Sequence, residues 1–272
     1  SFHRRAERPA PSPSPAVRPS VDRHGLMRLD SLLTQKGLAP SRTAAQRMIQ
    51  AGRVLLDSNP ALKAALEVTA DARVEVVADA DDRFVSRGGL KLAGTLAATG
   101  LPVVGKTCLD IGQSTGGFTD CLLQAGARHV VGVDVGHSQL HHRLADDPRV
   151  RALEGINCRT LSAAVLGPAF PASGFDLIVG DLSFISLTLI LPNLPALLAD
   201  GGHLLLLVKP QFEVGTGKVG KGGIVRDAAL YGDVERKLRQ CARDNGLVVR
   251  GWLDSPITGG DGNREFFIWL NK

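Results

Sequence analysis

The chain has 272 residues, of which 44% are hydrophobic and 22% are charged, and its formal net charge is +5. That length can hold one large domain and a small one. No apolar run approaches the roughly 18 residues of a membrane-spanning helix, and we find no signal-peptide segment, so we expect a cytoplasmic protein without a membrane partner. The four cysteines lack ligand-like spacing, so we expect reduced thiols and no metal site.

The positive charge is concentrated near the start of the chain. Residues 1–65 carry 11 Lys and Arg against 4 Asp and Glu, whereas residues 66–272 carry 21 against 23. This asymmetry indicates a module that binds a polyanion, attached to a nearly neutral domain. The first part, residues 1–26, is rich in Pro, Ser and Arg, and we expect a disordered extension there. The alternative for this extension is a solvated basic tail, whose arginines would account for part of the positive charge without a binding role.

A small module is predicted over residues 27–81. Its leucines suit a short helix that ends at Gly37, and Ser41 is a good N-cap for a second helix that ends at Gly52. One face of this second helix is polar and basic, and the opposite face is apolar. Two strands, at 54–56 and 73–77, are expected to follow. Exposed helices often carry arginines, so an ordinary solvated face remains an alternative to a binding surface.

Residues 82–104 are predicted to form an interdomain linker and a lead-in helix. The pair Gly88-Gly89 suggests a hinge or a close approach of two backbones. Lys91 follows it, and composition alone does not distinguish a functional lysine from a linker charge.

From residue 105 to 272, strands and helices alternate, which predicts an α/β domain with a doubly wound, mostly parallel sheet and a C-terminal antiparallel hairpin. The expected strands are 106–111, 129–134, 150–154, 175–181 and 203–209, with the hairpin at 247–253 and 265–270. The expected helices are 117–125, 138–145, 188–199 and 227–245.

A glycine-rich turn lies between the first of these strands and its helix. The turn runs from Gly112 to Gly117, and Asp134 follows Gly112 by 22 residues at the end of the next strand. An acid at that distance commonly accepts hydrogen bonds from ribose hydroxyls. The turn is not a GxGxxG sequence, so it fits S-adenosylmethionine better than a dinucleotide. A plain connection between strand and helix is the alternative.

Two later strands end in charged residues. Asp181 and Lys209 follow the strands at 175–181 and 203–209, and ligands of an open parallel sheet lie beyond such strand ends. A lysine beside a carboxylate can orient a hydroxyl group and accept its proton. Glu265 begins the last strand and could return to the same rim. Charges at strand ends also occur for solubility, which is the alternative for each residue alone.

These motifs, in this order, resemble the TlyA family of ribosomal RNA (cytidine-2′-O)-methyltransferases, which have an S4 domain and an FtsJ-like catalytic domain. The resemblance covers residues 27–272. It rests on the basic helix pair and on the segments Ser86–Leu92, Leu109–Asp120, Gly132–Gly136, Asp181–Ser186, Val208–Glu213 and Gly220–Asp227.

The resemblance implies a class I, Rossmann-like methyltransferase that uses S-adenosylmethionine. Its catalytic set falls on Lys91, Asp181, Lys209 and Glu265. The cofactor positions fall on Asp110, Gly112, Ser114, Thr115, Gly116, Phe118, Asp134, Val135, Asn157 and Asp181. Within the S4-like module and linker, we expect RNA contacts from Arg28, Arg42, Gln46, Arg47, Arg53 and Arg87. Gln113 departs from the small residue that is usual in the turn, and we expect it at the rim of the cofactor site.

The resulting hypothesis is 2′-O-methylation of cytidine in 16S rRNA, 23S rRNA or both, within ribosomal subunits. A non-catalytic RNA-binding assembly factor with a vestigial methyltransferase fold is the alternative. A membrane-lytic haemolysin is disfavoured because no spanning segment or strongly apolar amphipathic helix is present.

Overall fold

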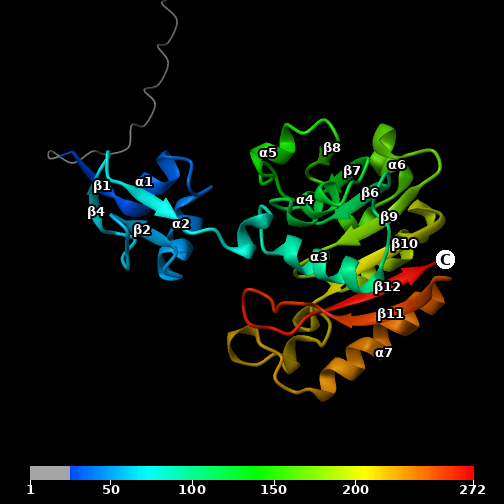
Figure 1. Cartoon of the computed structure of the whole chain (residues 1–272). Helices are drawn as coiled ribbons and strands as arrows, with labels where there is room; N and C mark the ends of the chain where they lie inside the picture. The colour runs from blue at the N-terminus through cyan, green and yellow to red at the C-terminus, as the bar shows by residue number, and fades with distance from the viewer. Residues whose placement is uncertain (1–24) are drawn as a thin grey trace, which may run out of the picture. The chain divides into compact units, whose positions relative to one another are not determined.

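The computed structural model describes residues 25–272, so nearly all of the predicted extension lies outside the described residues. Contacts within the chain define two units, with the boundary between Asp79 and Ala80 (Figure 1). Residues 82–104, which we expected to contain a linker, fall on the side of the second unit.

The first unit is a small α+β fold. Helix α1 (Leu29–Gln35) and helix α2 (Arg42–Gln50) pack together through Leu29, Leu33 and Ile49, which are fully buried. The Ser41 side chain accepts a hydrogen bond from the amide of Ala44, so the predicted N-cap is confirmed. The strands are β1 (Leu26–Arg28), β2 (Val54–Leu56), β3 (Asn59–Pro60), β4 (Glu67–Thr69) and β5 (Val74–Val76). Strand β1 pairs with β4, and β2 lies between β3 and β5.

The second unit is built on a seven-stranded sheet in the order β11-β12-β10-β9-β6-β7-β8. The five strands from β10 to β8 are parallel, and β12 runs antiparallel to both of its neighbours. The predicted doubly wound sheet with a C-terminal hairpin is therefore confirmed. The strands are β6 (Thr107–Ile111), β7 (His129–Val133), β8 (Val150–Leu153), β9 (Phe175–Gly180), β10 (Leu198–Val208), β11 (Val248–Asp254) and β12 (Phe266–Asn271).

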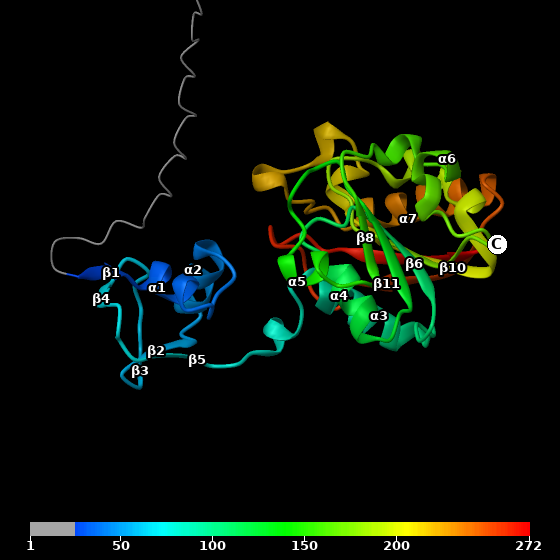
Figure 2. The ribbon, with the colours of Figure 1, turned by 90° about the horizontal axis from the view of Figure 1, so that it is seen from above.

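Helices cover both faces of this sheet (Figure 2). Helices α3 (Gly88–Thr99) and α4 (Gly117–Gln124) lie on one face, and α6 (Ala163–Leu166) and α7 (Ala229–Asp244) lie on the other. Strand β10 feeds both cores, because Leu204 and Leu206 join the cluster that includes α7, while Leu205 and Leu207 join the cluster that includes α3 and α4.

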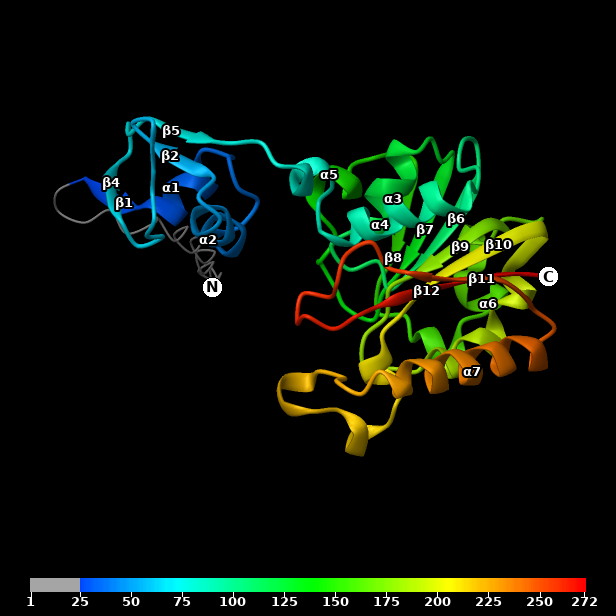
Figure 3. The same ribbon diagram turned by 60° about the horizontal axis from the view of Figure 1, so that its bottom comes forward.

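Helix α7 runs along the sheet (Figure 3). Leu230, Val234 and Leu238 recur at helical spacing and are buried, whereas the opposite face is charged. Over residues 25–272, no helix combines the length and apolar character that crossing a bilayer requires.

One predicted helix, at 138–145, is largely wrong. Only α5 (His142–Ala145) forms there, as a single turn. Ser138 has a φ of 55°, which a right-handed helix does not allow, and its amide donates to the Glu154 carboxylate instead. His141 then caps the short turn by accepting from the amide of Arg143.

The predicted α-helix at 188–199 is also wrong. Three short 3₁₀ turns replace it, at Leu187–Leu189, Leu191–Asn193 and Pro195–Leu197. Prolines 192 and 195 lack the amide hydrogen that an α-helix needs in its interior. Strand β10 begins immediately afterwards at Leu198, five residues earlier than predicted.

Candidate active site

A cleft opens at the carboxyl ends of the parallel strands. Strands β6, β9 and β10 end at Ile111, Gly180 and Val208, and the residues after each of them reach the cleft. It is lined by Ser86, Gly88, Lys91, Gly112, Gln113, Ser114, Thr115, Gly117, Phe118, Asp181, Ser183 and Lys209. The topology of a doubly wound sheet thus brings together residues that are up to 123 positions apart.

The glycine-rich turn packs tightly against the end of β9. Gly112 has a φ of 78°, and a Cβ atom there would lie 2.3 Å from the carbonyl oxygen of Asp181. Only glycine meets both conditions without displacing the neighbouring backbone. The contact keeps Asp181 next to the turn.

Asp181 and Lys209 form an ion pair at the cleft. The Lys209 Nζ lies 2.6 Å from Asp181 Oδ1 and donates a hydrogen bond of 2.9 Å to Ser183 Oγ. Asp181 Oδ1 has no aligned hydrogen-bond donor among the described residues, so its contact with the lysine is Coulombic. The side chains of Asp181 and Lys209 are 27% and 13% exposed, which leaves both reachable from the cleft.

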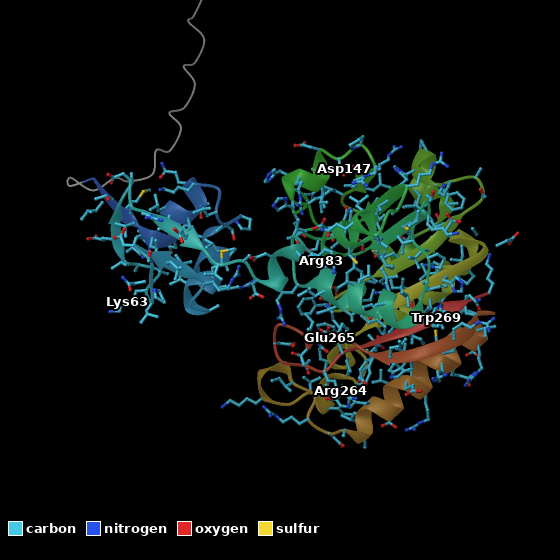
Figure 4. All side chains as sticks on the ribbon, in the orientation of Figure 1. Lys63, Arg83, Asp147, Arg264, Glu265 and Trp269 are labelled. Carbon is cyan, nitrogen blue, oxygen red and sulfur yellow. The ribbon has the colours of Figure 1, made fainter. Side chains whose placement is uncertain are left out.

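A second ion pair lies deeper. Lys91 projects from α3, and its Nζ lies 2.8 Å from the Oε2 of Glu265, which immediately precedes β12 and is labelled in Figure 4. Both side chains are buried. Burial raises the pKa of Glu265, while the Lys91 ammonium opposes that shift. Lys91 also lines the cleft, and the charge of Lys209 acts on Glu265 as well.

Asp110 heads a buried chain of hydrogen bonds beneath the turn. The Thr119 hydroxyl donates to Asp110 Oδ2 at 2.7 Å, and Gln113 Nε2 donates to that hydroxyl at 2.9 Å. Burial raises the pKa of Asp110 to about 7, although the hydrogen bond from Thr119 opposes the shift. The Gln113 side chain fills the space over Gly132, where a Cβ would lie 2.0 Å from its amide carbon. Gln113 lines the cleft, where we expected it, but its amide group turns into the protein.

Asp134 shapes the turn from the neighbouring strand. Its carboxylate accepts hydrogen bonds from the amides of Ser114 at 2.7 Å and Gly136 at 2.8 Å. Val135 is 73% exposed, and Asn157 caps a 3₁₀ turn through the amide of Arg159. Of the predicted cofactor positions, Asp110, Gly116, Asp134, Val135 and Asn157 are not among the residues that line the cleft.

The cleft fits S-adenosylmethionine. Gly112 and Gly117 line the cleft with backbone alone, and the partly exposed Asp181 carboxylate lies at the same cleft. A carboxylate with spare acceptor capacity complements a ligand that carries an ammonium and a sulfonium group. Ser114, Thr115 and Phe118 would hold the ligand on the side of the turn.

The first unit has its own charged cluster around a buried acid. Asp30 has no exposed side-chain surface, and Arg28 binds it with two hydrogen bonds of 3.0 and 2.9 Å. Gln46 donates to it at 2.9 Å, and Arg42 lies 3.4 Å away. Arg28 holds the pKa of Asp30 well below its usual range. Asp30 therefore holds three of the predicted RNA-binding side chains, Arg28, Arg42 and Gln46, in one group.

The remaining predicted RNA-binding arginines differ in their surroundings. Arg53 donates two hydrogen bonds to the carbonyl of Val77 and is 14% exposed, so its guanidinium serves the fold of its own unit. Arg47 is exposed on α2, and Arg87 precedes α3 in the second unit.

Several cleft residues were missed by our sequence assignments. Ser86, Gly88, Gly117 and Ser183 line the cleft, and Ser183 contacts Lys209. A signal for Ser183 was present, since it follows Asp181 by two residues. The signal for Ser86 was weaker, because a residue before a helix is brought to the cleft by tertiary packing alone.

Comparison with protein families gives two matches. A model described as FtsJ-like methyltransferase matches residues 84–272, and a model described as S4 domain matches residues 27–74. Together they cover both units of the chain.

Individual relatives match over most of the chain. The 16S/23S rRNA (cytidine-2′-O)-methyltransferase TlyA of Mycobacterium tuberculosis is 44% identical over 89% of this chain and 89% of its own length. A solved structure from Streptococcus thermophilus, described as a candidate hemolysin, is 40% identical with a TM-score of 0.71 and covers 91% of this chain and 89% of its own. A candidate S-adenosylmethionine dependent methyltransferase from Listeria monocytogenes shares the fold at 14% identity, with a TM-score of 0.50 over 68% of this chain and 98% of its own.

Proposed function

The chain belongs to the TlyA family of FtsJ-like methyltransferases, and on that premise we propose that it methylates the 2′-oxygen of cytidine in ribosomal RNA. The single observation that carries this proposal is the Asp181–Lys209 ion pair in the cleft that the glycine-rich turn borders. S-adenosylmethionine is the cofactor, and it supplies the methyl group as an electrophile.

The residues of the cleft would then remove the proton of the 2′-hydroxyl group. A 2′-hydroxyl can attack a methyl carbon only as its proton leaves, and a positioned base typically contributes about 10²–10⁴-fold to such a step. Lys209 would hold the hydroxyl, and the Asp181–Lys209 pair would take up the proton and pass it to solvent. Ser183 orients the ammonium group through its hydrogen bond with Lys209.

The buried Lys91–Glu265 pair would support the Asp181–Lys209 pair electrostatically. A buried lysine and glutamate that neutralise one another leave the cleft without an unbalanced charge. Glu265 also interacts with the charges of Lys209 and Asp181, so its charge would act on the ion pair at the cleft.

The substrate would be ribosomal RNA within ribosomal subunits, in 16S rRNA, 23S rRNA or both, which places the reaction in the cytoplasm. The S4 unit would bind phosphates through Arg28, Arg42 and Arg47, because RNA helices are recognised largely by shape and backbone contacts. In the described chain, Asp30 supports this role by grouping Arg28 and Arg42 on one face.

Kinetics of two lysine variants test the assignment. Lys209→Ala should lower kcat on ribosomal subunits by about 10²-fold or more while binding S-adenosylmethionine normally. Lys106→Ala, before β6 at the amino ends of the strands, is the matched control and should behave as the wild type. Unchanged methyl transfer by Lys209→Ala would contradict the proposal.

A further inference from the structure

Two segments that follow neighbouring strands lie side by side along the cleft. Residues 181–187 follow β9, and residues 209–213 follow β10. Their side chains meet in order along both segments. Asp181 and Ser183 contact Lys209. The ring centroids of Phe184 and Phe212 are 4.9 Å apart. Ser186 and Leu187 contact Glu213.

Glu213 is the last residue in this series of contacts. It ends the family segment Val208–Glu213, but no role was assigned to it there, and it does not line the active-site cleft. Its carboxylate is buried, with 2% of the side chain exposed. It accepts hydrogen bonds from the Ser186 hydroxyl at 2.6 Å and from the amide of Leu187 at 2.8 Å. Both donors belong to the segment that begins with Asp181.

A third element holds Glu213 from the other side. Lys237, on α7, places its Nζ 2.8 Å from Glu213 Oε2 and donates a hydrogen bond of 2.6 Å to the carbonyl oxygen of the same residue. A buried carboxylate is costly unless it is paired and hydrogen-bonded, and here its partners come from two other parts of the fold, the segment after β9 and helix α7. The contacts therefore make displacement of one segment relative to the other unfavourable.

We propose that Glu213 is a positioning residue, which sets the placement of Lys209 against Asp181 by locking the two segments to each other and to α7. Lys209 lies four residues before Glu213, and Asp181 lies five residues before Ser186, so a shift at the locked end alters the ion pair at the other. The catalytic part of this inference rests on the proposed function, since the effect of Glu213 on catalysis is measured as the rate of methyl transfer.

The test compares two Glu-to-Gln variants. Glu213→Gln keeps the volume of the side chain but loses its charge and one acceptor. We expect kcat on ribosomal subunits to fall by about 10²-fold, as misplacement of reacting groups by about 1 Å typically does, with the KM for S-adenosylmethionine unchanged. Glu235→Gln, which removes an ion pair with Arg239 elsewhere on α7, is the control and should match the wild type.

Hydrogen exchange gives a readout that does not depend on activity. In Glu213→Gln, the amides of residues 182–187 should exchange faster than in the wild type, while the amides of β6 and β9 keep their protection. Thermal unfolding shows whether the variants are folded at the assay temperature. Ser186→Ala is the milder variant, and its loss in kcat should be non-additive with that of Glu213→Gln because both act on one contact.

Three results would overturn the inference: unchanged exchange at 182–187, a kcat for Glu213→Gln equal to that of the wild type, or additive losses in the double variant. If the wild type itself transferred no methyl group to ribosomal subunits, the proposed function would fail, and the exchange measurement would still decide whether Glu213 locks the segments.

Discussion

At the scale of single residues, the two ion pairs of the catalytic unit have different surroundings. Lys91 and Glu265 are buried together, whereas Asp181 and Lys209 reach the cleft. A buried pair gives little net stability, but it is strongly destabilising to break. The pair at the cleft remains available to a substrate. We therefore expect the first pair to be more important for folding and the second for turnover.

Substitution of Lys91 tests the buried pair. Lys91→Met leaves the Glu265 carboxylate without its counter-charge, so we expect the free energy of unfolding of the catalytic unit to fall by about 3–5 kcal/mol. Denaturant unfolding followed by tryptophan fluorescence measures this change. The double variant Lys91→Met with Glu265→Leu removes both charges and should recover most of the stability. A double variant as unstable as Lys91→Met would show that the pair is not the cause.

The buried Asp110 predicts a pH dependence of stability. Its pKa in the folded chain is raised to about 7 by burial, above the ordinary value of about 3.9. Between these values the folded chain holds a proton that the unfolded chain has released. Asp110 therefore lowers stability as the pH rises from about 4 to 7, and the loss is complete above that range.

The variant Asp110→Asn isolates this effect, because it cannot release the proton. The free energy of unfolding of Asp110→Asn minus that of the wild type should be about 2 kcal/mol larger at pH 8 than at pH 5. Urea titrations at the two pH values measure the difference, and other titrating groups are common to both proteins. A difference between the two proteins that is the same at both pH values would contradict the raised pKa.

At the scale of elements, the carboxyl ends of the parallel strands were predictable because each strand is followed by a charged residue or a glycine. Strand β9, for example, runs from Phe175 to Gly180 and is followed by Asp181, within one residue of the prediction. The segment at 188–199 was not predictable in this way, since its leucines have helical spacing. Prolines within it and pairing of Leu198 with Phe175 favour 3₁₀ turns and an earlier strand.

The same contrast holds for the site. Asp181 and Lys209 could be predicted together, because parallel strands present their carboxyl ends at one edge. The partnership of Lys91 with Glu265 could be reached only through family resemblance, since 174 residues separate them and no single motif contains both. The inward turn of Gln113 depends on the absence of a side chain at Gly132, on another strand, which no local pattern encodes.

A single glycine tests the turn as a binding element. Gly112→Ala places a methyl group 2.3 Å from the Asp181 carbonyl oxygen and strains a positive φ, so affinity for S-adenosylmethionine should fall by about tenfold or more. Calorimetric titration measures the affinity. Gly201→Ala is the matched control, because its φ is 72° and no atom lies within 4 Å of the added methyl group. Equal affinities for S-adenosylmethionine in the two variants would contradict a role of the turn in binding.

At the scale of the whole molecule, the charged cluster at Asp30 and the cleft belong to different units. The S4 unit groups Arg28 and Arg42 around Asp30, while the second unit holds the cleft. This division predicts that affinity for RNA and the rate of methyl transfer can be altered independently.

Salt dependence of binding tests the role of the S4 unit. The double variant Arg42→Ala with Arg47→Ala should weaken binding to ribosomal RNA and reduce the slope of log affinity against log salt by about 2, because each phosphate contact contributes about 1. Arg149→Ala, in a bidentate pair with Asp147 on the catalytic unit, should leave the slope unchanged. An unchanged slope in the double variant would place the RNA contacts elsewhere.

The central claim is that the cleft transfers a methyl group to a ribose oxygen of ribosomal RNA. The most direct measurement incubates ribosomal subunits with the protein and S-adenosylmethionine that carries a deuterated methyl group, followed by mass spectrometry of the released nucleosides. We predict the label in 2′-O-methylcytidine with the wild type and its absence with Lys209→Ala. Label in a base or in ribosomal protein, with none on a ribose, would contradict the account.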